Sequence, residues 1–195
     1  MLFTTLSTKQ SVKPIRQQFS PRSILPIKSN QLWKIESGIV KATTWLEDDT
    51  TVTLGIWGPG DIVGKALSKV EAYQIECLTK VELIPFHAQE WQEITDLLLA
   101  HIQQTEELLL IRSYKKTDLM VIKLLSWLAK RFGHEVKNGQ LIDVRLTHQD
   151  IAEMLGTTRV TVTRVLIQLE QQGFIERLSL HRFLVKEEEL WHYEI

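Results

Sequence analysis

The feature that most constrains the fold is a pair of short amphipathic helices near residues 147–172, separated by a glycine. Thr147 precedes the first helix and Asp150 follows three residues later, which is the spacing of a capping box. Gly156 ends this helix and allows the chain to turn sharply into the next one. Two short helices that meet at a tight glycine turn are typical of a helix-turn-helix, which the segment therefore predicts.

The second helix, capped by Thr157 or Thr158, divides into a buried face and an exposed face. The apolar residues predicted to be buried by their spacing are Val162, Val165, Leu166 and Leu169. The residues left exposed near its start are Arg159, Val160, Thr161, Thr163 and Arg164. In a helix-turn-helix this part meets base edges in the major groove. An arginine there can bind guanine in a bidentate manner, worth about 1–3 kcal/mol, and a valine can contact a thymine methyl.

A predicted β-hairpin follows Gly173, with strands over 174–177 and 182–185. Helix, turn, helix and hairpin in this order are typical of a winged helix. The candidate DNA-binding residues are Thr147, His148 and Gln149 on the first helix, Thr158, Arg159, Val160, Thr161, Thr163 and Arg164 on the second, and Ser179, His181 and Arg182 in the wing. Residues 140–185 carry five basic and five acidic residues, so the prediction depends on this order of elements and not on net charge.

The N-terminal half has a different pattern of short strands and turns. Alternating or apolar runs, rich in Val, Ile and Trp, occur at 32–35, 39–45, 52–57 and 81–86. Strands of this length, spaced about ten residues apart, predict an antiparallel barrel or sandwich. The first 30 residues hold five basic residues and no acidic one, and we expect them to form a basic, partly ordered arm.

Helical periodicity begins after the last of these strands. Residues 88–115 contain no Gly or Pro, and their apolar residues are Ile94, Leu98, Ile102, Leu108, Leu109 and Ile111. The apolar face is longer than a small barrel needs, which favours a dimer seam; a helix packed wholly on its own domain is the alternative. Thr117-Asp118 is expected to cap a further helix over 119–132, with Lys123, Lys130 and Arg131 on its outer side. A strand over 141–144 is predicted next.

These features closely resemble the CRP/FNR superfamily, the cyclic-AMP receptor protein and its relatives, from about Ile24 to Val185. The matching residues are Thr147, Gln149, Ile151, Ala152, Gly156, Thr158, Arg159, Thr161, Val162, Arg164, Leu169, Gly173 and Ile175. The resemblance implies an α+β fold: an N-terminal cyclic-nucleotide-binding-like jelly-roll barrel, a long dimerisation helix and a C-terminal winged helix-turn-helix. We expect a sensor-like domain over 1–87, the dimerisation helix over 88–116, and the DNA-binding domain with an acidic tail over 117–195. The implied partners are double-stranded DNA, a second copy of the chain and RNA polymerase.

The resemblance also suggests a target sequence. Arg159 and Arg164 match the two DNA-reading arginines of the family, and Val160 stands where the cyclic-AMP receptor branch has a glutamate. The run from Thr158 to Arg164 is most similar to the nitrogen-control regulators of cyanobacteria. Those regulators recognise palindromes with GTA and TAC half-sites, so a site of this type is our hypothesis for the present chain.

The sensor region departs from the family where a cyclic nucleotide would bind. Residues 60–64 (Gly-Asp-Ile-Val-Gly) match the turn before the phosphate-binding cassette, but Lys65 replaces the usual glutamate. No arginine lies between Arg22 and Arg112, whereas a cyclic phosphate is normally held by one. We therefore expect no control by cyclic AMP. The same absence counts against binding of 2-oxoglutarate, and no cofactor is identified.

Other classes of protein fit the sequence poorly. No nucleophile–base pair or metal-ligand spacing indicates an enzyme. The single cysteine, Cys77, excludes a disulfide framework, a four-cysteine cluster and a zinc finger, which favours the cytoplasm. The longest apolar runs are too short to span a bilayer, so no membrane association is expected. The remaining alternative is a ligand- or protein-binding module whose winged helix mediates protein contacts.

Overall fold

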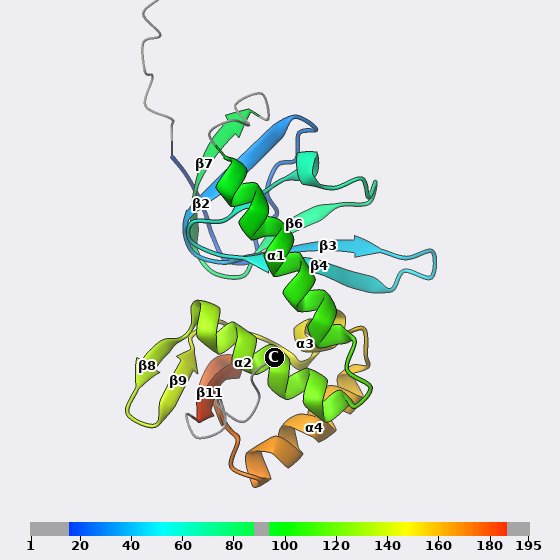
Figure 1. Ribbon diagram of the computed structural model, residues 1–195, viewed down its shortest axis with the longest axis vertical. Helices are drawn as coiled ribbons and strands as arrows, with labels where there is room; N and C mark the ends of the chain where they lie inside the picture. Colours follow the sequence, from blue (N-terminus) through cyan, green and yellow to red (C-terminus); the bar gives the residue numbers. More distant parts are fainter. Residues whose placement is uncertain (1–15, 88–93, 187–195) are drawn as a thin grey trace, which may run out of the picture.

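The computed structural model describes residues 16–87 and 94–186 and forms two parts joined by one long helix (Figure 1). The first part, which we call the sandwich, consists of two antiparallel sheets, with strand orders β1-β7-β2-β5 and β4-β3-β6. Its strands are β1 (Gln17–Phe19), β2 (Gln31–Ser37), β3 (Val40–Trp45), β4 (Thr51–Trp57), β5 (Ile62–Val63), β6 (Gln74–Cys77) and β7 (Val81–His87).

Alternation of apolar and polar residues builds the core of the sandwich. Trp33, Ile35, Trp57 and Leu83 point into one cluster and are almost wholly buried, whereas Trp45 at the end of β3 is 38% exposed. Cys77 also lies in this cluster, and burial, aided by the neighbouring charge of Glu76, raises the pKa of its thiol to about 11. The thiol is thus held in its unreactive protonated form.

Four of the seven strands match the predicted runs, and three were missed. β5 has two residues and β6 has four, which is too short for a clear periodic signal. β1 lies in the segment expected to be an arm, and this expectation is wrong for residues 16–30: β1 pairs with β7, and Leu25 is buried in the core. Residues 1–15 lie outside the described part of the chain.

Helix α1 (Thr95–Arg112) runs along the sandwich and leads into the second part, which we call the winged helix (Figure 1). The winged helix comprises α2 (Thr117–Phe132), β8 (His134–Val136), β9 (Gly139–Ile142), α3 (His148–Leu155), α4 (Arg159–Gln171), β10 (Ile175–Leu178) and β11 (Arg182–Lys186). Its four strands pair in the order β10-β11-β9-β8. This arrangement confirms the α+β fold class.

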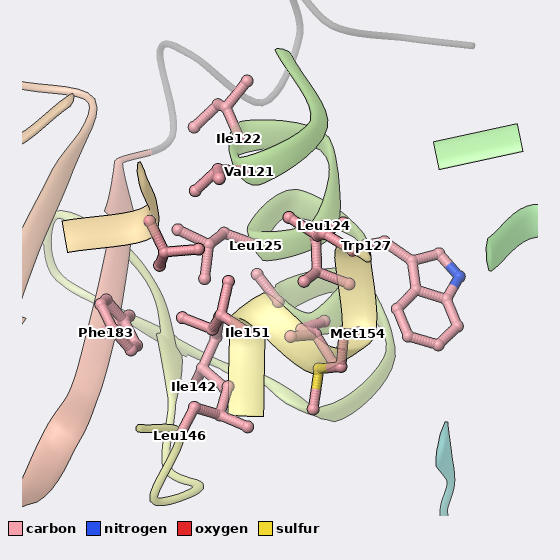
Figure 2. Packing of buried hydrophobic residues seen from close by; sticks show 14 of the residues in the cluster. Val121, Ile122, Leu124, Leu125, Trp127, Ile142, Leu146, Ile151, Met154 and Phe183 are labelled. Carbon is pink, nitrogen blue, oxygen red and sulfur yellow. The ribbon is translucent and has the colours of Figure 1, made fainter. Parts of the chain in front are cut away.

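One continuous core holds the winged helix together and joins it to the sandwich. Figure 2 shows side chains of α2, among them Leu124 and Leu125, packed against Ile151 of α3 and Ile142 of β9. The same cluster includes Ile39, Ile56 and Leu78 of the sandwich. The two parts are therefore in apolar contact in this conformation.

The predicted details of α2 need correction at its start and on its outer side. The helix begins at Thr117 with Lys116 as its N-cap, so Thr117 and Asp118 belong to the first turn. Lys123 is 6% exposed and lies over the ring of Tyr114, because the helix is covered on more sides than a one-faced pattern anticipates.

The other two basic residues of α2 differ from each other, and the following strand is shifted. Lys130 is exposed, as predicted, whereas Arg131 is partly buried and forms an ion pair with Asp61 at 2.9 Å. The strand expected over 141–144 is β9, Gly139–Ile142, whose register is set by pairing with β11.

Candidate nucleic-acid interface

Helix α3 begins with a complete capping box. Thr147 Oγ1 accepts a hydrogen bond from Asp150 N at 3.0 Å, and Asp150 Oδ2 accepts one from Thr147 N at 2.9 Å. These two bonds satisfy backbone donors that a helix start otherwise leaves open. Gly156 ends the helix in the left-handed conformation, with φ of 64°, which a glycine adopts without strain. The predicted helix-turn-helix geometry is thereby confirmed at its cap and at its turn.

Thr158, not Thr157, caps α4. Its Oγ1 accepts a hydrogen bond from Thr161 N at 3.2 Å and lies 2.9 Å from Thr161 Oγ1. The four residues predicted to be buried by spacing, Val162, Val165, Leu166 and Leu169, are at most 4% exposed and pack in the core that contains Ile151 and Ala152 of α3. Their burial fixes which face of α4 is left to solvent.

The outward face of α4 carries both arginines and an exposed valine. Val160 is 79% exposed, and Arg159 and Arg164 are also exposed. Together with Thr163 and Ile167 they line a shallow groove of about 500 Å³. Within the described parts of the chain, neither guanidinium has a carboxylate partner. Both cations are thus available to an external anion or to a base edge.

Ile167 was not among the predicted site residues. It is 40% exposed and lies one helical turn after Arg164, on the same stripe as Val160. The spacing of 160, 164 and 167 could have identified it. The groove is therefore longer and more apolar than the sequence pattern indicated.

Thr163 and His148 link the two helices. Thr163 Oγ1 donates to Arg159 O at 2.9 Å and lies 2.8 Å from His148 Nδ1, so the imidazole is the donor in this second bond. Burial, together with the nearby positive charges of Arg177, His181 and Arg159, lowers the pKa of His148. His148 is accordingly neutral at neutral pH, and its hydrogen bond with Thr163 links α3 to α4. Its neighbour Gln149 is exposed and donates to Glu153 Oε1 at 3.1 Å.

The wing lies beside the start of α3. The rings of His148 and His181 are 6.3 Å apart, and Ser179 and His181 are exposed. Arg182 is less free than predicted, because its Nη1 donates to Asp143 at 3.0 Å and its Nε donates to Ser179 O at 3.2 Å. Leu180 at the tip is 71% exposed, a feature that no sequence pattern indicated.

Other kinds of site are not found in the described residues. No group of three or more His, Cys, Asp or Glu residues could hold a metal ion there. Within 16–87 and 94–186, no helix combines the length and the apolar character needed to cross a membrane.

Comparison with known proteins decides the family. The model of the Crp-like helix-turn-helix domain matches residues 121–191. The regulatory protein CysR of Synechococcus elongatus is 40% identical over 167 residues, which cover 84% of this chain and 81% of CysR. The chain belongs to the CRP/FNR family. A global nitrogen regulator of Nostoc is a further relative, 27% identical over 171 residues, which cover 79% of this chain and 75% of that protein.

A solved structure shares the fold. A CRP-family transcriptional regulator from Thermus thermophilus superposes with a TM-score of 0.77 at 20% identity, covering 90% of this chain and 95% of that one. As a member of the CRP/FNR family, the protein is a transcription regulator with a DNA-binding helix-turn-helix, and not an enzyme.

Proposed function

We propose that this regulator acts in the cytoplasm as a homodimer on an inverted repeat with GTA and TAC half-sites, without control by cyclic AMP. The observation that carries the proposal is the outward face of α4, where Arg159, Val160 and Arg164 are exposed and the arginines have no acidic partner in the described residues. The arginines would read guanines, and Val160 would contact a thymine methyl. Contact with RNA polymerase at a promoter is part of the same proposal.

The surface of α1 supports the dimer. Leu99, Ile102 and Leu109 are between 53% and 62% exposed, and their spacing fits one a and two d positions of a heptad pattern. The opposite face, with Gln104, Leu108 and Ile111, is buried against the rest of the chain. Two residues of this stripe, Ile102 and Leu109, also border the cavity between α1 and the sandwich but stay largely exposed. An exposed apolar stripe on a helix that is already packed on its other side favours a second copy as its partner.

The cavity between α1 and the sandwich supports independence from cyclic AMP. It has a volume of about 560 Å³, and its lining residues are Leu54, Trp57, Leu67, Ser68, Tyr73, His101, Ile102, Thr105, Glu106 and Leu109. Among the described residues, the lining holds no lysine or arginine and has one carboxylate, Glu106, which repels a cyclic phosphate. The nearby Lys65 donates to the carbonyl oxygens of Ser68 and Val70, so its charge stabilises the loop.

Fluorescence anisotropy with a labelled duplex tests the proposal. The wild-type protein should bind a GTA/TAC inverted repeat in preference to a scrambled duplex, and added cyclic AMP should leave the affinity unchanged. Arg159→Ala should weaken binding to the specific duplex by about 1–3 kcal/mol and leave binding to the scrambled duplex nearly unchanged. Lys130→Ala, which removes a positive charge from α2, is the matched control.

Equal affinity of wild type and Arg159→Ala for the specific duplex would refute the role of α4. A dimer that binds no DNA, with or without added metabolites, would favour the alternative of a winged helix used for protein contacts.

A further inference from the structure

Helix α3 is attached to the sandwich through a buried cluster of charges. Lys41 of β3 is 3% exposed, and its Nζ lies 2.9 Å from Asp150 Oδ1, 3.4 Å from Glu153 Oε2 and 3.5 Å from Glu76 Oε2. Asp150 and Glu153 belong to α3, whereas Glu76 belongs to β6. A lysine of the sandwich therefore holds two carboxylates of the helix-turn-helix.

A second cation completes this cluster. Arg22 Nη1 donates to Glu76 Oε1 at 2.9 Å, and its Nη2 lies 3.5 Å from Asp150 Oδ2. Arg22 has a φ of 68°, a left-handed backbone that is uncommon for a residue other than glycine. Asp150 is thus contacted by two cations of the sandwich in addition to its bonds with Thr147.

The other end of α3 is held by a third cation. Arg112, the last residue of α1, donates from Nε to Met154 O at 2.5 Å and from Nη2 to Thr53 O of β4. A guanidinium at the C-terminus of a helix satisfies a carbonyl that lacks an intrahelical partner. Cations from outside the winged helix therefore contact α3 near both of its ends.

Charge pairing stabilises the charged forms of these groups despite their burial. Burial alone would lower the pKa of Lys41, but the carboxylates around it raise this pKa above its ordinary value. Burial opposes the charge of Asp150, yet hydrogen bonds from Lys41 and Thr147 hold its pKa at about 2. Buried ion pairs contribute little net stability compared with apolar packing, but they restrict groups to one geometry. The ion pairs around Lys41 can therefore fix the position and orientation of α3 relative to the sandwich.

The position of α3 is passed on to α4 through packing. Ile151, Ala152 and Leu155 of α3 are buried in the core that also contains Val162 and Leu166 of α4. The hydrogen bond between His148 and Thr163 adds a polar link between the same helices. Close-packed helices transmit displacement, so a change in the position of α3 against the sandwich also moves α4.

We propose that Lys41 is a positioning residue for DNA reading: by holding Asp150 and Glu153 against the sandwich, it sets the direction in which α4 is presented. In a dimer this direction determines the separation of the two α4 helices, and hence the half-site spacing that the protein accepts. The inference rests on the proposed homodimer and inverted repeat.

The test measures affinity for duplexes whose two half-sites are separated by the optimal spacer or by one base pair more or less. Wild type should show a sharp optimum. Lys41→Met should bind the optimal duplex about tenfold more weakly and should discriminate less among the three spacings, because α4 is no longer held in one direction. Its affinity for a duplex with a single half-site should stay at the wild-type value, since the face of α4 is intact.

A second variant guards against misfolding. Lys41→Met alone leaves carboxylates without this partner. Lys41→Met combined with Glu153→Met replaces a partly buried ion pair by apolar side chains of similar length, and such replacements are often neutral or stabilising. In the double variant Asp150 keeps Thr147 and Arg22, and Glu76 keeps Arg22. We expect the same loss of spacing discrimination. Lys80→Met, an exposed lysine of the sandwich, is the matched control and should behave as wild type.

The outcomes separate the two proposals. A folded double variant with the wild-type spacing profile would overturn the role of Lys41 and leave the proposed function standing. A wild-type protein without any spacing optimum would refute the dimer on an inverted repeat, and the positioning role with it.

Discussion

At the scale of residues, Arg159, Val160 and Arg164 form the exposed face of α4 that would meet DNA. The spacing of Val162, Val165 and Leu166 is enough to place Arg159 and Arg164 on the outward face of α4, because helical periodicity is a local property. The pair between Arg182 and Asp143 could not be predicted in this way. It depends on how β11 and the segment after β9 lie side by side, which is set by long-range strand register.

Val160 provides a residue-scale prediction of base preference. Replacing it by glutamate removes the methyl groups that favour thymine and adds an acceptor for the amino group of cytosine. Val160→Glu should therefore change the preferred base at one position of each half-site, by about tenfold in relative affinity. Competition binding with duplexes that differ only at that position measures the change.

A matched variant separates the two effects. Val160→Ala should lose the preference for thymine without gaining one for cytosine. An unchanged preference in Val160→Glu would show that the side chain at 160 does not contact a base.

At the scale of elements, the exposed apolar stripe of α1 is interrupted by a charged residue. Glu106 lies between Ile102 and Leu109 on the exposed stripe, at the position where the heptad pattern calls for an apolar residue. In a parallel pair, two such carboxylates would face each other and repel. The stripe therefore predicts opposite effects for two substitutions.

Leu109→Glu should raise the dimer dissociation constant at least about tenfold, because it buries a charge without a partner. Glu106→Leu should lower the same constant, because it removes the repulsion and extends the apolar seam. Sedimentation equilibrium measures both. Leu180→Glu makes the same change at the exposed tip of the wing and is the control.

The assignment of the dimer seam would be contradicted by a monomeric wild type. It would also be contradicted if Leu109→Glu were as dimeric as wild type.

The elements also show where sequence patterns lose information. Among the described residues, the four longer strands of the sandwich and the α-helices α1 to α4 are long enough for their period to be read, and the sequence predicts their existence correctly. β5 is two residues long, and β1 is placed only by its pairing with β7. Periodicity predicts an outer face for Lys123, because it does not reveal that α1, α3, α4 and strands together cover α2.

At the scale of the whole molecule, several contacts join the sandwich and the winged helix, among them the bonds of Arg112 to Thr53 and Met154. The two parts also share an apolar core, the ion cluster around Lys41 binds α3, and Asp61 binds both Gln104 of α1 at 2.5 Å and Arg131 of α2 at 2.9 Å. None of these contacts was visible in the sequence, since each joins residues far apart in the chain. The conformation described here thus presents α4 in one fixed direction relative to the sandwich.

The most direct test of the central claim is selection of bound sequences from random duplex DNA, with purified protein and no added small molecule. We predict that wild type enriches an inverted repeat of GTA and TAC half-sites, and that Arg159→Ala loses the preference at one base pair of each half-site. Enrichment of no sequence, either alone or with a metabolite pool, would contradict the claim that this protein reads DNA through α4.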